Sequence, residues 1–504
     1  MPTRVLKDHL ILTIAAAIAI YLVIARACVQ SITIDEADSY LLFAHQAWPA
    51  QWYPSSGNHV LNSILMRLIT TVFGISELTV RSPAILGAIL YIASAFYLAA
   101  SLATRKLLQL SIFVCLVYNP FVLDYLVAAR GYGLAIGCLM AALALIAKMV
   151  LSGEATRNEC TGVSVFLALS FAANFSFAIA NACVLLLFFL WAARREKIRP
   201  LAISCFVPGF AVAFVLAGSV VWNWPKGQLY FGSQHLSEMW AGLRDTSFDN
   251  LNPEIFNPLL LSWLSYLQPV LPYLAALTFF ALLITVEIRR WRSRPRFKDE
   301  LLTLMRLFTG MAILTIFLHW AALRTFHLLL PKDRTALFLV PFLTLALAAA
   351  LAICCRSKEK DYFRIAGMGV MLLAAIYFIG CIRLEYFKEW KFDADCKHVY
   401  WICEDLQRRC GAATFVTNWR YNSPLNFYRT AYGNHWLPEF TGSADTFPSG
   451  KDVYVMFFPD TQEFMKKEGV QVIYHDDRSD VAVAIRGCPA ASKSAVYDSS
   501  KGSQ

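Results

Sequence analysis

Apolar residues along this chain of 504 residues gather into repeated long blocks, separated by shorter polar segments. A helix of about 20 such residues crosses the roughly 30 Å hydrocarbon core of a bilayer. One block alone would fit a signal peptide, but the repetition excludes that explanation. We therefore predict eleven membrane-spanning helices, at 10–27, 80–101, 107–124, 131–150, 162–178, 179–193, 201–221, 262–288, 302–323, 335–354 and 365–383.

The segment 28–79, called the first long loop below, is too polar to cross a membrane. Its second half, HVLNSILMRLITTVFG, has a helical period of apolar residues and a single charge, Arg67. This pattern predicts a helix that either lies in the membrane interface or packs on the surface of the bundle.

A change of composition after residue 383 predicts a separate domain at 384–504, joined to a transmembrane domain at 1–383. The stretch DADCKHVYWICEDLQRRCG reads as a helix, and TFVTN, DVYVMFF, QVIYHD and VAVAI read as strands. Between the second and third strands, TQEFMKKEG reads as a helix that ends at Gly469. The fold class is therefore mainly α, with a small C-terminal α/β domain and a disordered tail, ASKSAVYDSSKGSQ.

Composition and charge agree with a membrane location. The chain is 58% hydrophobic and 16% charged, whereas soluble domains are about 45–50% apolar and about 25% charged. Its net charge of +10 comes largely from basic runs between apolar blocks, at 104–106, 194–199, 289–298 and 356–360. Cytoplasmic loops carry such runs, which places the N-terminus inside and the segments 28–79, 222–260, 324–334 and 384–504 outside. No run joins a recognition fold, so nucleic-acid binding is not indicated.

The thirteen cysteines do not indicate a metal site, because no CxxC or Cys/His spacing for zinc is present. Four lie in the C-terminal domain: Cys396, Cys403, Cys410 and Cys488. The first three are spaced by seven residues, about 10.5 Å along a helix, which is beyond the roughly 7 Å limit for a disulfide. A bond from one of them to Cys488 stays open.

Candidate chemistry begins after the first apolar block, in SITIDEADSYLLFA, with Asp35, Glu36 and Asp38. Carboxylates beside hydrocarbon are costly unless they are solvated, paired or used. One of them can accept a proton from a hydroxyl that lies within hydrogen-bond reach. The alternative is a helix start, with Thr33 or Asp35 as N-cap and acidic residues in the first turn.

Three further polar clusters lie in segments predicted to be outside. SSGNHVLNSILMRL contributes Asn58, His59 and Asn62, and NPFVLDYLVAARGYGLA contributes Asp124, Arg130 and Tyr132. An ion pair between Asp124 and Arg130 that holds a tight hairpin is the structural alternative for the second cluster. In LRTFHLLLPKDRTALFLVP, Arg324, His327, Lys332 and Arg334 break the positive-inside pattern. Several cations in a short outside loop favour a bound anion, and phosphate suits Arg and Lys donors.

The order of these motifs resembles the GT-C glycosyltransferases, in the branch of protein O-mannosyltransferases and the lipid A aminoarabinose transferase. The resemblance covers about residues 1–350. It rests on the DE pair, the Asn-His loop, an Arg-Ser-Pro helix start at 81–83, LDYLVAARGYGLA and DRTALFLVP. The chain departs from the family in reading NHVLN where many relatives are proline-rich, and DRT where Arg-Tyr is more usual. The identity of the sugar and of the acceptor therefore does not carry over.

The resemblance implies roles for particular residues. Asp35 matches the catalytic acid, with Glu36 in a supporting or acceptor-orienting position. Arg130 and Arg334, with Lys332 close by, match cations that hold a lipid phosphate, and His59 matches a position that lines the cavity. The remaining candidates for substrate binding are Asp38, Asn58, Asp124 and Tyr132. A divalent metal beside Asp35 and Glu36 stays open.

The implied function is a membrane glycosyltransferase that moves a hexosyl or pentosyl unit from a polyprenyl-phosphate donor by inverting displacement. The acceptor would be a lipid, a glycan or a protein outside a bacterial inner membrane. The alternative is a multi-span transporter or flippase of a lipid-linked or anionic substrate. Transporters often show two related halves, and no internal repeat is detectable in the sequence.

Overall fold

The structure is a computed structural model that describes residues 9–225, 227–228, 231–292, 299–356, 362–411, 414–442, 447–458 and 462–486. The chain divides into two compact units. The first unit is drawn from Met1–Ile24, Trp52–Asn62 and Pro83–Arg383. The second is drawn from Ala25–Gln51, Ser63–Ser82 and Leu384–Gln504. The C-terminal residues therefore share a unit with most of the first long loop.

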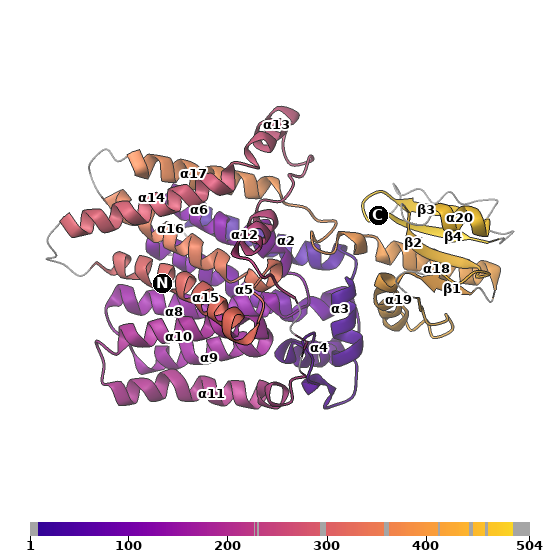
Figure 1. The fold of residues 1–504 in the computed structure, drawn as a ribbon, viewed down its shortest axis with the longest axis horizontal. Coiled ribbons are helices and arrows are strands. Elements are labelled where there is room, and N and C mark those ends of the chain that lie inside the picture. The colour runs from indigo at the N-terminus through magenta and orange to yellow at the C-terminus, as the bar shows by residue number, and fades with distance from the viewer. Residues whose placement is uncertain are drawn as a thin grey trace. The chain divides into compact units, whose positions relative to one another are not determined.

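Helices make up the first unit (Figure 1). Their bounds, including three helices that continue into the second unit, are α2 Leu10–Val29, α4 Val60–Phe73, α5 Glu77–Leu102, α6 Lys106–Val117, α7 Pro120–Tyr125, α8 Tyr132–Ser152, α9 Arg157–Ala173, α10 Ala178–Ala192, α11 Ile198–Trp222, α12 Leu236–Ser247, α13 Pro258–Leu267, α14 Leu271–Arg292, α15 Glu300–Phe326, α16 Leu339–Arg356 and α17 Tyr362–Gly380. Short 3₁₀ turns lie at Phe175–Phe177 and Asp333–Ala336, the second of which is labelled η4.

Among the described residues, nine helices are long and apolar enough to cross a membrane. The chain is a multi-pass membrane protein, and nine of the eleven predicted spans correspond to these helices. The predicted span at 107–124 is instead two short helices, because Pro120 starts α7 and Asn119 caps it. The span predicted at 162–178 corresponds to α9, whose 17 residues end at Ala173. The span predicted at 262–288 begins later than expected: residue 262 lies in the short helix α13, and the long helix α14 begins at Leu271.

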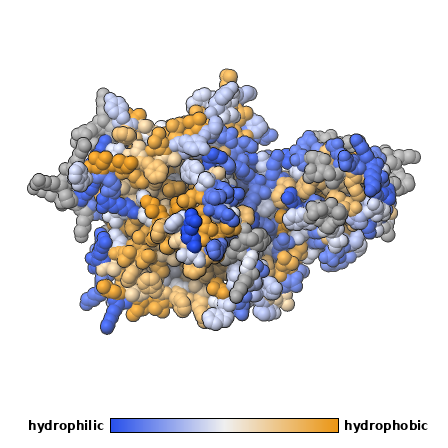
Figure 2. Space-filling view, viewed as in Figure 1, coloured by the Kyte–Doolittle hydropathy of each residue, from blue (hydrophilic) through white to orange (hydrophobic). Residues whose placement is uncertain are grey.

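The helices differ in how much protein surrounds them. In α8, 78% of the most apolar window is buried, against 22% in each of α11 and α14. Small residues let α8 pack closely: a Cβ on Gly87 of α5 would lie 2.3 Å from the carbonyl oxygen of Gly133. Such close backbone approach is typical of helix packing in membranes. Apolar residues cover much of the visible face of this unit (Figure 2), as expected for a surface that faces lipid.

The first long loop contains the helix predicted near 59–74, which is α4. Val72 and Phe73, near the end of α4, are about three-quarters exposed (73% and 74%), as suits a helix at a membrane interface. Ahead of it, a five-residue helix, α3 (Ile34–Asp38), continues directly into a π-helical turn, η1 (Ser39–Ala44).

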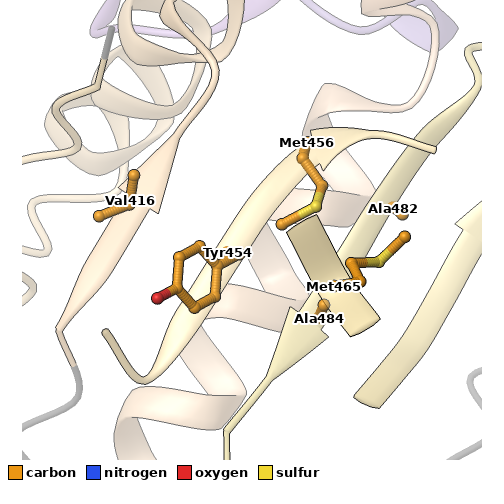
Figure 3. Close-up of a cluster of buried hydrophobic side chains, with 6 residues drawn as sticks. All are labelled: Val416, Tyr454, Met456, Met465, Ala482 and Ala484. Carbon is orange, nitrogen blue, oxygen red and sulfur yellow. The ribbon is translucent and has the colours of Figure 1, made fainter. Parts of the chain in front are cut away.

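The C-terminal part of the second unit is an α/β structure, as predicted. Its elements are α18 Cys396–Cys410, β1 Phe415–Thr417, α19 Trp419–Ala431, β2 Val453–Phe457, α20 Gln462–Glu468, β3 Gln471–Asp476 and β4 Val481–Ile485. The sheet has the order β1-β2-β4-β3, in which β1 pairs with β2 in parallel and the other pairs are antiparallel. Met465 of α20 packs on the sheet among Tyr454, Met456 and Ala484 (Figure 3).

All four strands and the helix before Gly469 are found where the sequence predicted them, and Gly469 adopts a left-handed φ of 64°. Helix α19 was not predicted, because its sequence contains Pro424 and several weak helix formers. Cys410 is disulfide-bonded. Cys488 and the tail ASKSAVYDSSKGSQ lie outside the described residues.

Candidate functional site

The predicted acidic cluster belongs to the second unit, where it begins with a capped helix. Thr33 is the N-cap of α3: its hydroxyl accepts from the Glu36 amide (3.2 Å), and its amide donates to the Glu36 carboxylate (3.0 Å). This reciprocal arrangement is a capping box. The structural alternative for the DE motif, a helix start capped by Thr33, is therefore correct for Thr33 and Glu36.

Glu36 is also paired with Arg81 at the start of α5. The Arg81 Nε and Nη2 atoms lie 2.9 Å and 2.7 Å from the two oxygens of Glu36. Both side chains are fully buried. Arg81 additionally donates to three backbone carbonyls, those of Ala27, Gln30 and Ser31. Such a fully bonded pair holds the loop in place, so the geometry gives Glu36 a supporting role.

The pairing of Glu36 with Arg81 limits its ability to bind the divalent metal ion that the resemblance left open. Both Glu36 oxygens are used by Arg81, and one also accepts from Thr33. Among the described residues, no group of three or more His, Cys, Asp or Glu side chains is placed to hold a metal ion. The donors around Asp35 and Glu36 therefore do not fit a divalent cation.

Asp35 and Asp38 differ from Glu36 in being partly exposed. The Oδ1 atom of Asp38 accepts a hydrogen bond of 2.5 Å from the hydroxyl of Ser423, on α19. Asp35 lies in the first turn of α3, between the backbone cap at Thr33 and the bonded Asp38. Of the two catalytic candidates, Asp35 and Glu36, only Asp35 reaches the surface.

The Asn-His motif belongs to the first unit. The Asn58 side chain donates to the Tyr53 carbonyl (2.8 Å), and Asn62 donates to the carbonyl of Ala129 (3.2 Å). Both asparagines are fully buried. The Asn62 bond attaches the start of α4 to the α7–α8 hairpin, and the Asn58 bond fixes the loop just before His59.

The α7–α8 hairpin places Arg130 beside this motif. Its guanidinium donates to the carbonyl of Gly57 (3.3 Å), and its own carbonyl accepts from Asn174 (3.4 Å). Gly131 follows in a left-handed conformation (φ 73°), where a Cβ would lie 2.2 Å from the carbonyl oxygen of Ala173. Only glycine fits this turn, which explains the Arg-Gly pair in the sequence. Asp124 lies on the preceding helix and is partly exposed.

His59 is the most unusual group in this cluster. Its side chain is 5% exposed, and neither ring nitrogen has a hydrogen-bond partner among the described residues. Its ring packs edge-on against the ring of Tyr132, with the centroids 5.9 Å apart. Burial lowers the pKa of His59 well below its usual value, and the positive charges of Arg130 and Arg334 lower it further. His59 is therefore a neutral imidazole close to two arginines.

The third part of the cluster is η4 and the loop before it. Ser233 and Leu330 exchange two backbone hydrogen bonds of 2.9 and 2.8 Å, which fixes this loop. Arg334 is partly exposed and stacks on Phe231, 4.7 Å from the ring centre. Lys332, also partly exposed, caps η4 through a bond from its amide to the Thr335 hydroxyl (2.8 Å).

Two other cations predicted for this region lie elsewhere. Arg324 and His327 are exposed at the end of α15, where Arg324 stacks on Trp320 at 5.7 Å. Neither contributes to the shifted pKa of His59, whereas Arg130 and Arg334 both do. The structure therefore brings together His59, Arg130 and Arg334, which are far apart in the sequence.

An apolar cavity of about 200 Å³ lies in the same unit. The sequence gives no sign of this cavity, because its wall includes α12, an amphipathic helix too short to stand out from the loops around it. Helix α12 also contacts η4, where Gly242 packs against Asp333, and α16 follows directly on η4. The cavity is lined mainly by α12, α14, α16 and α17, with Trp240, Leu243, Arg244, Phe279, Val340, Leu347 and Phe378 among its residues.

No family model matches the sequence, and no curated protein matches it significantly. Solved structures do match. ArnT from Cupriavidus metallidurans, bound to undecaprenyl phosphate, has a TM-score of 0.50 at 12% identity, over 95% of this chain and 98% of ArnT. The mycobacterial arabinofuranosyltransferase AftD has a TM-score of 0.48 at 14% identity, over 95% of this chain and 40% of AftD. The Archaeoglobus fulgidus oligosaccharyltransferase has a TM-score of 0.44 at 15% identity, over 84% and 64%. The match to ArnT shows that this chain has an ArnT-like fold, in agreement with the resemblance of its motifs.

Proposed function

We propose that this protein is a membrane glycosyltransferase that takes a sugar from a polyprenyl-phosphate carrier. The observation that carries the proposal is the cluster of His59, Arg130 and Arg334 in the same unit as an apolar cavity. A lipid phosphate has both features, an anionic head and an apolar tail. The basic runs favour an N-terminus in the cytoplasm, and the family resemblance of the motifs favours a bacterial inner membrane.

The head of the carrier fits the cationic cluster. Two guanidinium groups supply donors that match phosphate oxygens, often in pairs. A buried imidazole without a partner is costly to maintain. A bound phosphate would accept a hydrogen bond from the N–H of His59, which removes that cost. Lys332, two residues before Arg334, adds a further cation to the same loop.

The tail of the carrier fits the apolar cavity. Leu347 and Val340 line it from α16, the helix that begins a few residues after Arg334. A chain anchored by its phosphate at η4 would therefore reach the cavity along α12 and α16. The isoprenoid tail would exchange contacts with lipid for contacts with the side chains of the cavity, so packing would favour it there. The undecaprenyl phosphate named in the ArnT structure is a carrier of this class, which supports the proposed donor.

The chemistry we assign is a single inverting displacement. The oxygen of an acceptor hydroxyl forms a bond to the anomeric carbon, and the bond from that carbon to the phosphate oxygen breaks. The phosphate leaves with the electron pair, and its developing charge is stabilised by Arg334, Arg130 and Lys332. Asp35 receives the proton of the acceptor hydroxyl. A hexosyl or pentosyl donor and a lipid, glycan or protein acceptor are all compatible with this step.

Binding of undecaprenyl phosphate to the purified protein tests the donor assignment. Arg334→Ala should weaken the affinity by at least about 10-fold, the usual effect of losing a hydrogen bond to a charged group. Arg334→Lys should fall in between, because it keeps the charge and loses the planar fork. The matched control is Arg324→Ala, which removes an exposed, ring-stacked arginine near the same loop and should leave the affinity unchanged.

Lipid-linked glycan profiling of a deletion strain tests the transfer itself. The strain should accumulate a polyprenyl-phosphate sugar and lack the corresponding glycosylated product. An affinity for undecaprenyl phosphate that survives Arg334→Ala, together with an unchanged lipid profile, would refute the proposed donor.

A further inference from the structure

We propose that the C-terminal domain positions the catalytic carboxylate, and that Asp393, Ser423 and Tyr428 are the residues that do so. The inference rests on the proposed function, because it concerns where Asp35 is held. It explains why the C-terminal domain and the acidic part of the first long loop form one compact unit.

The N-terminal end of α3 is held by two side chains of the C-terminal domain. The Oδ2 atom of Asp393 accepts from the amide of Ile34 (2.8 Å), and the Tyr428 hydroxyl accepts from the amide of Ile32 (2.9 Å). Just before them, the Ser31 hydroxyl donates to the carbonyl of Ala394 (2.8 Å). These amides would otherwise lack partners at a helix start.

The C-terminal end of α3 is held by α19. Ser423 donates to Asp38 over 2.5 Å, and the ring of Phe427, one turn later, packs edge-on against Tyr40 with the centroids 5.6 Å apart. Residues more than 350 positions away in sequence therefore form hydrogen bonds with the chain on both sides of Asp35.

Helix α3 cannot hold this geometry alone. It has five residues, and isolated helices shorter than about 12–15 residues are marginal in water. The Glu36–Arg81 pair fixes the side of α3 that faces the start of α5. The C-terminal domain supplies the other restraints, and Asp35 is left partly exposed between them.

The chemistry of Asp393 suits this task. Its carboxyl is almost fully buried, and burial raises its pKa well above the usual value, with the charges of Asp35 and Glu36 acting in the same direction. A neutral carboxyl can still accept from the Ile34 amide. Asp393 therefore holds the backbone beside Asp35, while its burial disfavours a second negative charge next to the base.

Position matters to a general base, because it must lie within hydrogen-bond reach of the acceptor proton. A misplacement of about 1 Å can cost roughly 10²-fold in rate. Ser423→Ala should lower kcat about 3- to 10-fold, as expected for one hydrogen bond, and leave the donor KM and the melting temperature unchanged. The double variant Ser423→Ala/Tyr428→Phe should lose about 10²-fold in kcat.

Conservative variants separate positioning from folding. Ser423→Thr and Asp393→Asn keep a donor to Asp38 and an acceptor for the Ile34 amide, so both should retain most activity. The matched control is Ser449→Ala, which removes an exposed hydroxyl of the same domain that bonds Glu468 (2.8 Å) far from α3 in sequence. It should behave as wild type.

A readout without catalysis completes the test. Amide hydrogen exchange of the peptide covering 31–40, in the full-length protein, should quicken in the double variant and not in Ser449→Ala. Normal kcat and normal exchange in the double variant would overturn the inference. A wild-type protein without transfer activity would refute the proposed function instead, and the exchange data alone would then decide whether the domain holds α3.

Discussion

Each unit contains buried polar side chains, and the two units differ in whether those side chains have hydrogen-bond partners. In the second unit, Glu36 and Arg81 are fully buried, and five hydrogen bonds from Arg81 reach the Glu36 carboxylate and three backbone carbonyls. In the first unit, His59 is almost as buried and has no partner for either ring nitrogen among the described residues. Buried polar groups are normally bonded. We therefore propose a structural role for the satisfied pair and a ligand-binding role for the imidazole of His59.

The same difference separates two neighbouring carboxylates. Glu36 is buried and paired with Arg81, whereas Asp35 is partly exposed. The DE motif alone gives no reason to distinguish the two residues. Candidate residues in this chain are therefore better ranked by what their side chains bond than by the motif in which they lie.

The largest effect is expected at Asp35. Asp35→Asn should lower turnover about 10²–10⁴-fold, because the amide has nearly the same shape and cannot accept the proton. Affinity for undecaprenyl phosphate and the melting temperature should stay at wild-type values. Turnover of a polyprenyl-phosphate sugar by the purified variant provides the measurement. Wild-type turnover in Asp35→Asn would move the base to another residue.

A large loss of stability is expected at the satisfied pair. Arg81→Leu should destabilise the protein by about 3–5 kcal/mol, because it leaves Glu36 buried without its cation. The double variant Glu36→Leu/Arg81→Leu should recover part of that loss, since no lone charge remains. Thermal melts of both, beside Arg334→Ala, provide the measurement. An Arg334→Ala variant that loses as much stability as Arg81→Leu would contradict the distinction between the two clusters.

A loss of binding without a loss of stability is expected at His59. His59→Phe keeps a ring against Tyr132 and removes both nitrogens, so the melting temperature should not fall. Affinity for undecaprenyl phosphate should drop about 10-fold or more, the effect of one hydrogen bond to a charged group. His59→Gln, which keeps a donor, should lose less. A marked drop in melting temperature with unchanged affinity would instead make His59 a packing residue.

The smallest effect is a pH dependence in the C-terminal domain. Burial raises the pKa of Asp395 to about 7, and the nearby charge of Asp476 acts in the same direction, whereas a hydrogen bond from Tyr474 opposes them. A carboxyl with a raised folded-state pKa contributes stability at low pH that is lost as the pH rises through that value. Stability should therefore fall between about pH 4, near the usual pKa of an aspartate, and about pH 7. Asp395→Asn should flatten that slope in melts followed across this range, and an equal slope in both proteins would exclude this group.

Much of the fold followed from the sequence, for a simple reason. Apolar blocks of membrane length and alternating strand patterns report burial that is local to each element, so nine spans and all four strands were found. The errors came where a local signal competed with a longer pattern. Pro120 divides a predicted span, and helix α19 was not predicted because Pro424 lies inside it. Helix α12 escaped notice because it is short and amphipathic.

The candidate site divides in the same way. The sequence by itself determined which residues are chemically able to act, since an acidic pair, an Asn-His loop and misplaced cations stand out from their apolar surroundings. Only the tertiary structure decided what each one bonds. Glu36 meets Arg81 across 45 residues, and Asp38 meets Ser423 across 385. Residue types and spacing encode burial along the chain, but the satisfaction of a buried charge depends on which distant segment packs against it.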